Sequence, residues 1–141
     1  MKRFFWITLA LLPFLSCTRQ SAGGTSAGIP FEDTRWKLTS LTGITQLPAA
    51  DKDMFTRFYK KRAYAYAGCN NLVGSYTLQG NTLKVMNLAS TKMACPQPFM
   101  DAETQLTEAL HHSTGFKIVG NKMLLMKGAT VVAEFEASSA K

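Results

Sequence analysis

Two cysteines in the body of the chain restrict its fold more than any other sequence feature. Cys69 stands between Gly68 and Asn70, and Cys95 ends residues 91–95 (Thr-Lys-Met-Ala-Cys), with strand-like patterns on both sides. In an oxidising compartment an even pair favours one structural disulfide, worth about 3–4 kcal/mol for a loop of this size. Two reduced, buried thiols and a redox pair are the alternatives, although redox cysteines usually lie two residues apart.

Polar residues beside the cysteines predict a tight turn. Asn70 and Asn71 are turn residues that tolerate a left-handed backbone. We expect the side chains of Asn70 and Thr91 to hydrogen-bond the backbone and fix this turn, and only secondarily to contact a ligand.

The N-terminus is predicted to be a targeting segment. Two basic residues precede an apolar run over residues 4–15, which is too short to span a bilayer as a helix and suits a signal peptide. Phe14-Leu15-Ser16-Cys17 resembles the lipobox of bacterial lipoproteins. This resemblance implies removal of residues 1–16, a diacylglycerol on the Cys17 sulfur and an acyl chain on its amine. The alternative is an ordinary signal peptide, cut nearby, that leaves a free exported protein.

Residues 17–31 are predicted to form a flexible tether, because they are rich in Ser, Gly, Thr and Ala. Such a coil reaches roughly 20 Å, which keeps the folded part near the membrane surface without packing on it. No aspartate follows Cys17 to signal inner-membrane retention, and no acidic run indicates surface export. We therefore expect a lipid-anchored protein of the bacterial cell envelope, at the periplasmic face of the outer membrane.

The charge pattern argues against nucleic acid as a partner. The formal net charge of +7 falls to +5 when the signal peptide, with two basic residues and no acidic one, is removed. The only cluster is Lys60-Lys61-Arg62, with Arg57 nearby, and a solvated turn explains it. An exported protein rarely meets nucleic acid, and the sequence shows no basic patch interleaved with aromatic residues.

Hydrophobic periodicity predicts short strands interrupted by one helix. Alternation and turn signals indicate strands at residues 34–41, within 54–67 with a turn at Lys60-Lys61, and at 73–78, 82–88, 116–119, 123–126 and 131–136. From Phe99 onward the apolar residues recur at helical spacing. Residues 98–113 are therefore predicted to form a helix that Pro98 begins and Gly115 stops.

These elements predict an α+β fold that is mostly antiparallel β. Strands joined by tight turns pair antiparallel. One helix cannot cover both faces of about eight strands, so the sheet must curl around a shared core. The expected architecture is a half-open small barrel of about seven or eight strands, closed by one α-helix, over residues 32–137.

The cysteine motifs also carry a family resemblance. The chain resembles the META domain (HslJ-like, DUF306) over about residues 34–135, in Trp36-Lys37-Leu38, Gly68-Cys69-Asn70, Gly74-x-Tyr76, Thr91-x-Met93-Ala94-Cys95 and the hairpin at Gly120-Asn121. The resemblance implies a half-open β-barrel completed by one helix, with Gly68, Asn70, Thr91 and Met93 as motif residues. It also implies envelope or secreted proteins linked to stress tolerance, with no accepted enzymatic reaction.

Catalytic and metal-binding chemistry find no support in the sequence. There is no Gly-x-Ser-x-Gly motif, and no acidic pair can be placed in one cleft, so we expect no enzyme and no cofactor. His111 and His112 would point about 100° apart on a helix, and no further ligand lies at zinc spacing from them. Favourable charge at the helix C-terminus explains both.

Four aromatic side chains are candidates for a ligand site inside the barrel. Tyr64, Tyr66, Tyr76 and Phe99 are expected to line it, where they could hold an acyl chain or apolar peptide, although small barrels are more often filled by their own side chains. The expected function is a non-catalytic, membrane-anchored envelope lipoprotein that binds an envelope protein partner or supports stress tolerance. The alternative is a carrier or sensor of a small apolar ligand or lipid.

Overall fold

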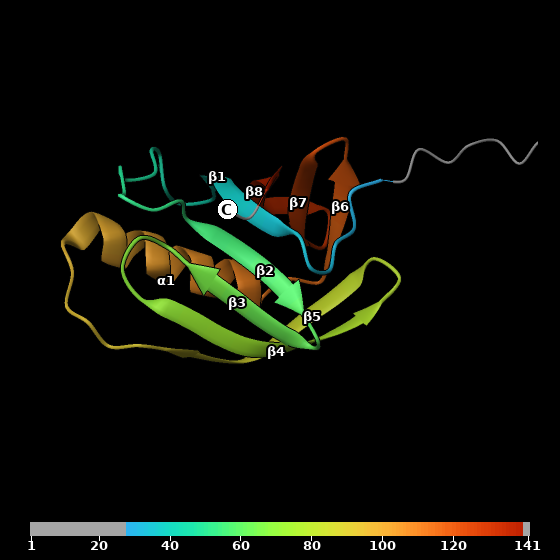
Figure 1. The fold of residues 1–141 in the computed structure, drawn as a ribbon, viewed down its shortest axis with the longest axis horizontal. Coiled ribbons are helices and arrows are strands. Elements are labelled where there is room, and N and C mark those ends of the chain that lie inside the picture. The colour runs from blue at the N-terminus through green and yellow to red at the C-terminus, as the bar shows by residue number, and fades with distance from the viewer. Residues whose placement is uncertain (1–27, 140–141) are drawn as a thin grey trace, which may run out of the picture.

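The computed structural model describes residues 28–139, so the predicted signal peptide and the lipidation site at Cys17 lie outside the described residues. Eight strands and one helix follow one another along this part of the chain (Figure 1). The strands are β1 (Arg35–Leu41), β2 (Phe55–Tyr59), β3 (Arg62–Tyr66), β4 (Asn71–Gln79), β5 (Thr82–Ser90), β6 (Gly115–Val119), β7 (Lys122–Lys127) and β8 (Thr130–Ser138). Helix α1 (Gln97–His111) stands between β5 and β6.

Tight turns at three predicted positions connect the strands. Lys60 and Lys61 have φ angles of 47° and 64°, the left-handed backbone that a two-residue hairpin turn between β2 and β3 requires. Gly80 and Gly120, with φ of 56° and 62°, serve the β4–β5 and β6–β7 turns. The hairpins are thus fixed locally, by residues that accept positive φ.

The turn predicted at Asn70-Asn71 lies slightly earlier in the chain. The backbone bends over residues 67–70, and the residue with positive φ is Gly68, at 97°, whereas Asn71 is already the first residue of β4. β4 and β5 are therefore longer than the hydrophobic alternation indicated, because their paired ends carry the polar residues Asn71 and Ser90.

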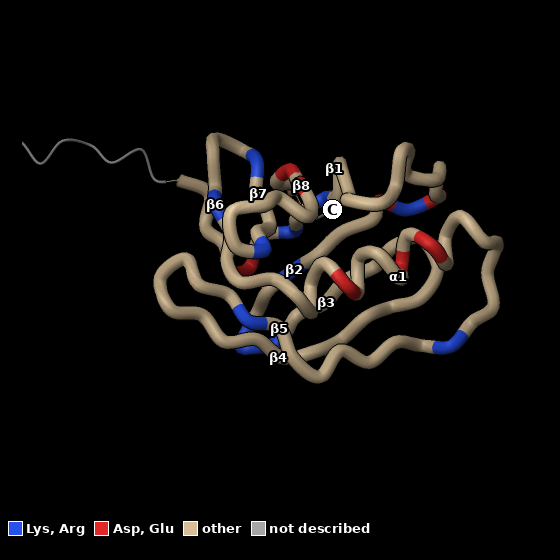
Figure 2. Tube along the Cα trace, turned by 180° about the vertical axis from the view of Figure 1, so that it is seen from behind, with Lys and Arg blue, Asp and Glu red and all other residues tan. Residues whose placement is uncertain are grey.

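The sheet closes on itself, with its shortest strand pairing between β5 and β6, and α1 contacts β5 as well as β1, β7 and β8. Each strand pairs antiparallel with its chain neighbour, and β8 pairs with β1, whereas β5 and β6 share the single pair Thr82 and Gly115. A Cβ at Gly115 would lie 2.7 Å from the backbone oxygen of Asn81, so only glycine permits this approach. From behind, α1 lies between the β4–β5 and β7–β8 parts of the sheet (Figure 2). The predicted α+β fold, a small antiparallel barrel with one helix, is confirmed, and the barrel that was expected to be half-open is closed through the single pair between β5 and β6.

Helix α1 lies within two residues of its predicted bounds, residues 98–113, at both ends. It begins one residue earlier and ends at His111, where the N–H of His112 donates to the carbonyl of Glu108 at 3.0 Å. Gly115 is the first residue of β6 and does not stop the helix. The inner face of α1 buries Ala102, Glu103, Leu106, Ala109 and Leu110.

Within residues 28–139, the barrel interior is filled by the protein's own side chains. The largest fully buried residues come from the sheet and from α1, and they include Trp36, Tyr76, Phe58, Phe135, Leu72, Leu83, Leu106, Leu110, Met123 and Leu125. The space between helix and sheet is therefore a packed core. It leaves no support for an acyl chain or apolar peptide held inside the barrel.

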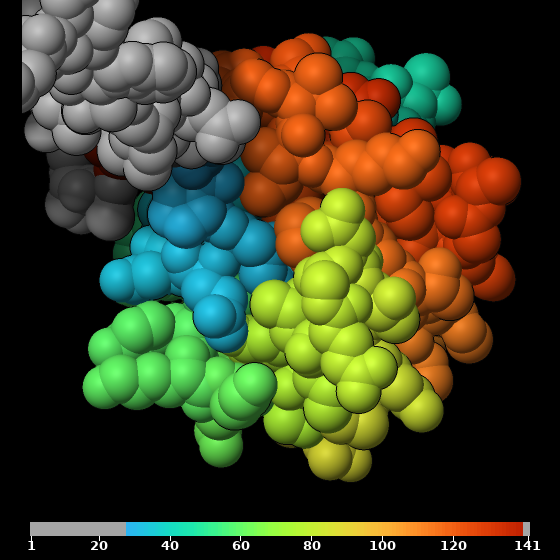
Figure 3. Space-filling model, turned by 90° about the vertical axis from the view of Figure 1, so that its right-hand side faces the viewer, coloured from blue at the N-terminus to red at the C-terminus, as the bar shows by residue number. Residues whose placement is uncertain are grey.

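The segment before β1 plugs one end of the barrel. The Phe31 ring stacks on Phe58 and Phe116, with centroids 4.5 Å and 4.0 Å away, and its carbonyl accepts a hydrogen bond from Nε1 of Trp36 at 3.0 Å. Figure 3 shows this segment, in blue, against the green β2–β3 hairpin. Phe31, which the sequence placed at the end of the tether, is a core residue, so the folded part begins before residue 32.

Candidate functional site

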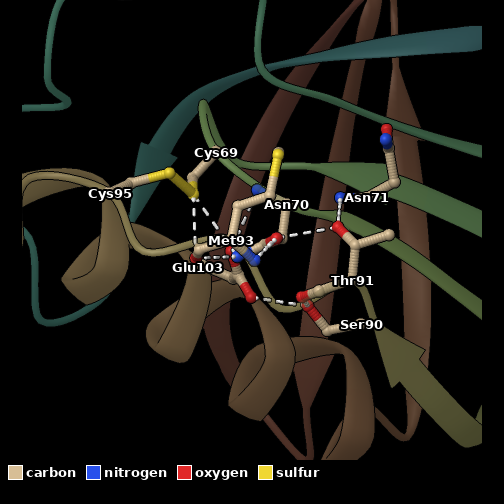
Figure 4. The surroundings of a disulfide bond; sticks show 8 residues. All are labelled: Cys69, Asn70, Asn71, Ser90, Thr91, Met93, Cys95 and Glu103. Atoms are coloured by element: carbon tan, nitrogen blue, oxygen red, sulfur yellow. Dashed lines mark hydrogen bonds between the residues drawn. A yellow bond between two sulfur atoms is a disulfide. The ribbon is translucent and has the colours of Figure 1, made fainter.

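The two cysteine motifs meet beside the N-terminal half of α1 (Figure 4). Cys69 and Cys95 form a disulfide with their Cα atoms 6.1 Å apart, which ties the bend before β4 to the linker that enters α1. The predicted disulfide is therefore present. We call this cluster the cysteine clamp: Gly68, Cys69, Asn70, Ser90, Thr91, Met93, Cys95 and Glu103.

Asn70 is the hub of the cysteine clamp. Its side chain is buried, its Oδ1 accepts from the backbone N–H of Met93 at 2.8 Å, and its Nδ2 donates to the Met93 carbonyl at 3.1 Å. The Thr91 hydroxyl also donates to Oδ1, at 2.7 Å, and accepts from the N–H of Asn71 at 3.2 Å. The predicted backbone-fixing roles of Asn70 and Thr91 agree with this geometry.

Glu103 connects the cysteine clamp to the helix, a role that the sequence analysis missed. Its Oε2 accepts from the backbone N–H of Asn70 at 3.1 Å, and its Oε1 accepts from the Ser90 hydroxyl at 2.7 Å. A buried polar side chain is tolerated when it is hydrogen-bonded in this way. Glu103 is four residues after Phe99 and three before Leu106, so the helical period already placed it on the inner face.

Gly68 and Phe99 complete the cysteine clamp by close packing. A Cβ at Gly68 would lie 2.5 Å from Cδ1 of Phe99 and 2.9 Å from Cε of Met54, so the bend needs glycine for space as well as for its φ. Phe99, predicted to line a ligand site, therefore packs on the clamp backbone. The predicted motif residues Gly68, Asn70, Thr91 and Met93 all belong to this clamp, and Met93 contributes to it through its backbone.

The predicted placement of two tyrosines in the barrel interior is wrong. Tyr64 is 37% exposed and Tyr66 is half-buried, whereas Ala63 and Ala65, which alternate with them on β3, are buried. The interior is already occupied by large side chains from other strands, so only alanine fits on the inner side of β3. The two tyrosines consequently belong to the outer surface.

Tyr76 does point inward, but it is a structural residue. It is buried, packs edge-on against Phe58 at 5.2 Å between centroids, and donates its hydroxyl to the Glu32 carboxylate. Burial and the hydrogen bond to Glu32 raise the pKa of Tyr76 well above the ordinary value for tyrosine. This contact ties the segment before β1 to β4.

The outer side of β1, β2 and β3 brings cationic and aromatic side chains together. Arg35, Arg57 and Tyr64 are neighbours across the three strands, as are Phe55 and Tyr66, and Tyr59 and Arg62. We call this surface the basic-aromatic face: Arg35, Phe55, Arg57, Tyr59, Lys60, Lys61, Arg62, Tyr64 and Tyr66. Arg35, Phe55, Arg57, Tyr59 and Tyr64 line an open hollow of about 360 Å³ on it.

Aromatic rings hold the cations of the basic-aromatic face in place. The guanidinium carbon of Arg35 lies 3.5 Å from the ring centroid of Phe55, and Nζ of Lys60 lies 4.9 Å from that of Tyr59. The guanidinium carbon of Arg57 lies 5.4 Å from the Tyr59 centroid, and Arg57 also pairs with Asp33. The rings position charges that an anionic group can reach, so this is the best candidate binding surface.

The basic-aromatic face was not predicted from the sequence, where its basic and aromatic residues do not form one patch. Its members come from three strands, and only the register of β1 on β2 and of β2 on β3 places them side by side. The sequence did contain a pattern that predicts this face. The buried residues Phe58 and Ala63 alternate with Arg57, Tyr59, Arg62 and Tyr64, which places these four side chains together on the outer side of the sheet.

The structure gives the histidines predicted at the end of α1 a local role and no place in a metal site. Among residues 28–139, no group of three or more His, Cys, Asp or Glu side chains could hold a metal ion. Nε2 of His112 instead lies 3.1 Å from Oε2 of Glu108, and the His111 ring packs edge-on against the His112 ring. In the same residues, no helix has the length and apolar character that crossing a membrane requires.

The comparisons with known proteins define the class of this chain. The META domain family model matches residues 30–139, and the chain belongs to this family, which is not a known family of enzymes. A protein from Burkholderia xenovorans solved by NMR has a similar structure, with 26% identity, a TM-score of 0.64, and coverage of 78% of this chain and 85% of that one. A second NMR structure shows the same fold at 19% identity and a TM-score of 0.61, over 75% and 90%. No curated protein matches.

Proposed function

We propose that the chain is a non-catalytic, membrane-anchored envelope lipoprotein whose META domain acts by binding an envelope component at its outer surface. The observation that carries this proposal is the division of side chains between interior and surface. The interior is filled, and the two cysteine motifs of the family form the cysteine clamp. At the surface, cationic and aromatic side chains come together on the basic-aromatic face.

The anchor in this proposal is the lipid on Cys17, supported by the lipobox-like residues before it. The stress tolerance implied by the family resemblance would then come from binding at the envelope and not from a reaction.

Labelling of the full chain in bacteria with a clickable fatty acid tests the anchor. The wild-type chain should carry the label and sediment with membranes, and its intact mass should start at Cys17. The Cys17→Ala variant should lose both properties, whereas the matched variant Thr18→Ala should keep them. An unlabelled wild-type chain in the soluble fraction would overturn the proposal.

A further inference from the structure

The structure fixes where the chain enters the domain. Phe31 is held between Phe58 and Phe116, and the N–H of Asp33 donates to the Phe58 carbonyl at 2.7 Å. The Asp33 carboxylate pairs with Arg57. The N-terminal chain therefore meets the domain beside the β2–β3 hairpin, at one edge of the basic-aromatic face (Figure 3).

Positive charge that no acid neutralises gathers at the same place. Lys60, Lys61 and Arg62 are exposed, and none of them forms a salt bridge within residues 28–139. This cluster of positive charge thus lies where the N-terminal chain enters the domain.

We propose that the basic-aromatic face docks on the anionic phospholipid headgroups of the membrane that carries the Cys17 anchor. The inference rests on the proposed function, because the anchor supplies the membrane. Lipid phosphates complement clustered Lys and Arg side chains near a bilayer surface, and tyrosine rings favour the interface between headgroups and water.

The length of the N-terminal chain favours a membrane over a soluble acidic partner. Residues 18–27 separate Cys17 from the described part, and a chain of that length reaches at most roughly 40 Å. An anchored domain therefore keeps its basic-aromatic face at high local concentration beside the headgroups. Docking would orient the domain on the bilayer, in contrast to a domain that swings freely on its tether.

Photocrosslinking of the lipidated full chain in vesicles tests the docking. Benzoylphenylalanine replaces Tyr64 on the face or, as a matched control, the exposed Thr130 at the opposite end of the barrel. Vesicles contain phosphatidylcholine alone or phosphatidylcholine with phosphatidylglycerol. We expect about tenfold more lipid adducts at position 64 than at 130 on the anionic vesicles, with loss of the excess at high salt and in the variant Lys60→Gln/Lys61→Gln/Arg62→Gln.

Equal adduct yields at the two positions, or equal yields on neutral and anionic vesicles, would overturn the docking. Crosslinks from position 64 to a protein in place of lipid in native envelopes would also overturn it, while leaving a binding role intact. The intact mass of the same sample reports the lipid on Cys17. An unlipidated chain overturns the proposed function, whereas a lipidated chain without position-64 adducts overturns only the docking.

Discussion

The side-chain amide of Asn70 pairs with the backbone of Met93 through two hydrogen bonds, much as one strand residue pairs with another. The pairing fixes the linker between β5 and α1 without a strand, because Met93 lies beyond the end of β5. The disulfide holds the same linker two residues later. Hydrogen bonds and a covalent bond thus act together where the helix enters the fold.

The Asn70→Ala variant should lose about 2–4 kcal/mol of unfolding free energy. Truncation removes two hydrogen bonds to the Met93 backbone and one from the Thr91 hydroxyl, and each contributes about 0.5–1.5 kcal/mol. Urea denaturation followed by circular dichroism measures the loss. The control is Asn71→Ala, at the adjacent exposed residue, which should change stability by about 0.5 kcal/mol or less. Equal losses for the two variants would refute the hub role of Asn70.

The Gly68→Ala variant should be destabilised more than Gly80→Ala. Both glycines have positive φ, which costs alanine about 1–2 kcal/mol. Only Gly68 has neighbours in the way, because its Cβ would overlap Phe99, and overpacking adds about 1–3 kcal/mol. Thermal unfolding of the two variants side by side measures the difference. Matching melting temperatures would show that Phe99 moves aside without cost.

The double variant Cys69→Ala/Cys95→Ala should lose about 3–4 kcal/mol, the loop-closure contribution of the disulfide in the chain-entropy model. The variant should still fold, because the hydrogen bonds of Asn70 and Glu103 remain. Guanidinium denaturation of the oxidised wild type, the reduced wild type and the variant measures the effect. The reduced wild type should resemble the variant; an unchanged midpoint on reduction would contradict the prediction.

Much of this fold could be predicted from the sequence because its signals are local. Lys60-Lys61, Gly80 and Gly120 mark hairpins through backbone conformation alone, and the paired cysteines indicated that distant segments meet. Strand alternation gives two faces but not which one is inside when both are apolar. On β3 the alanines face inward, where the buried residues Phe58 and Leu72 are the cross-strand neighbours of Ala63 and Ala65.

The candidate surface could not be predicted in the same way, because it depends on register. Arg35 and Arg57 are far apart in the chain and become neighbours only through the pairing of β1 with β2. The role of Glu103 was missed because its partner, the backbone N–H of Asn70, lies 33 residues away in the chain. Such polar contacts within the interior require the tertiary structure.

Stability should fall with rising pH above about 10 through Tyr76. The unfolded chain releases this phenolic proton near the ordinary pKa of about 10, whereas burial and Glu32 raise the pKa of Tyr76 in the folded state. The folded state thus binds more protons than the unfolded state in that range, so the unfolding free energy decreases, by at most about 1.4 kcal/mol per pH unit. Below pH 9 both states keep the proton and the contribution is constant.

The Tyr76→Phe variant tests this linkage because it keeps the buried ring and removes only the hydroxyl that donates to Glu32. It should be less stable than the wild type near neutral pH, by about 0.5–3 kcal/mol for a hydrogen bond to a charged group. Urea midpoints measured from pH 8 to above pH 10 should converge for the two proteins as the wild type loses its advantage. Curves that stay parallel would show that Tyr76 keeps an ordinary pKa.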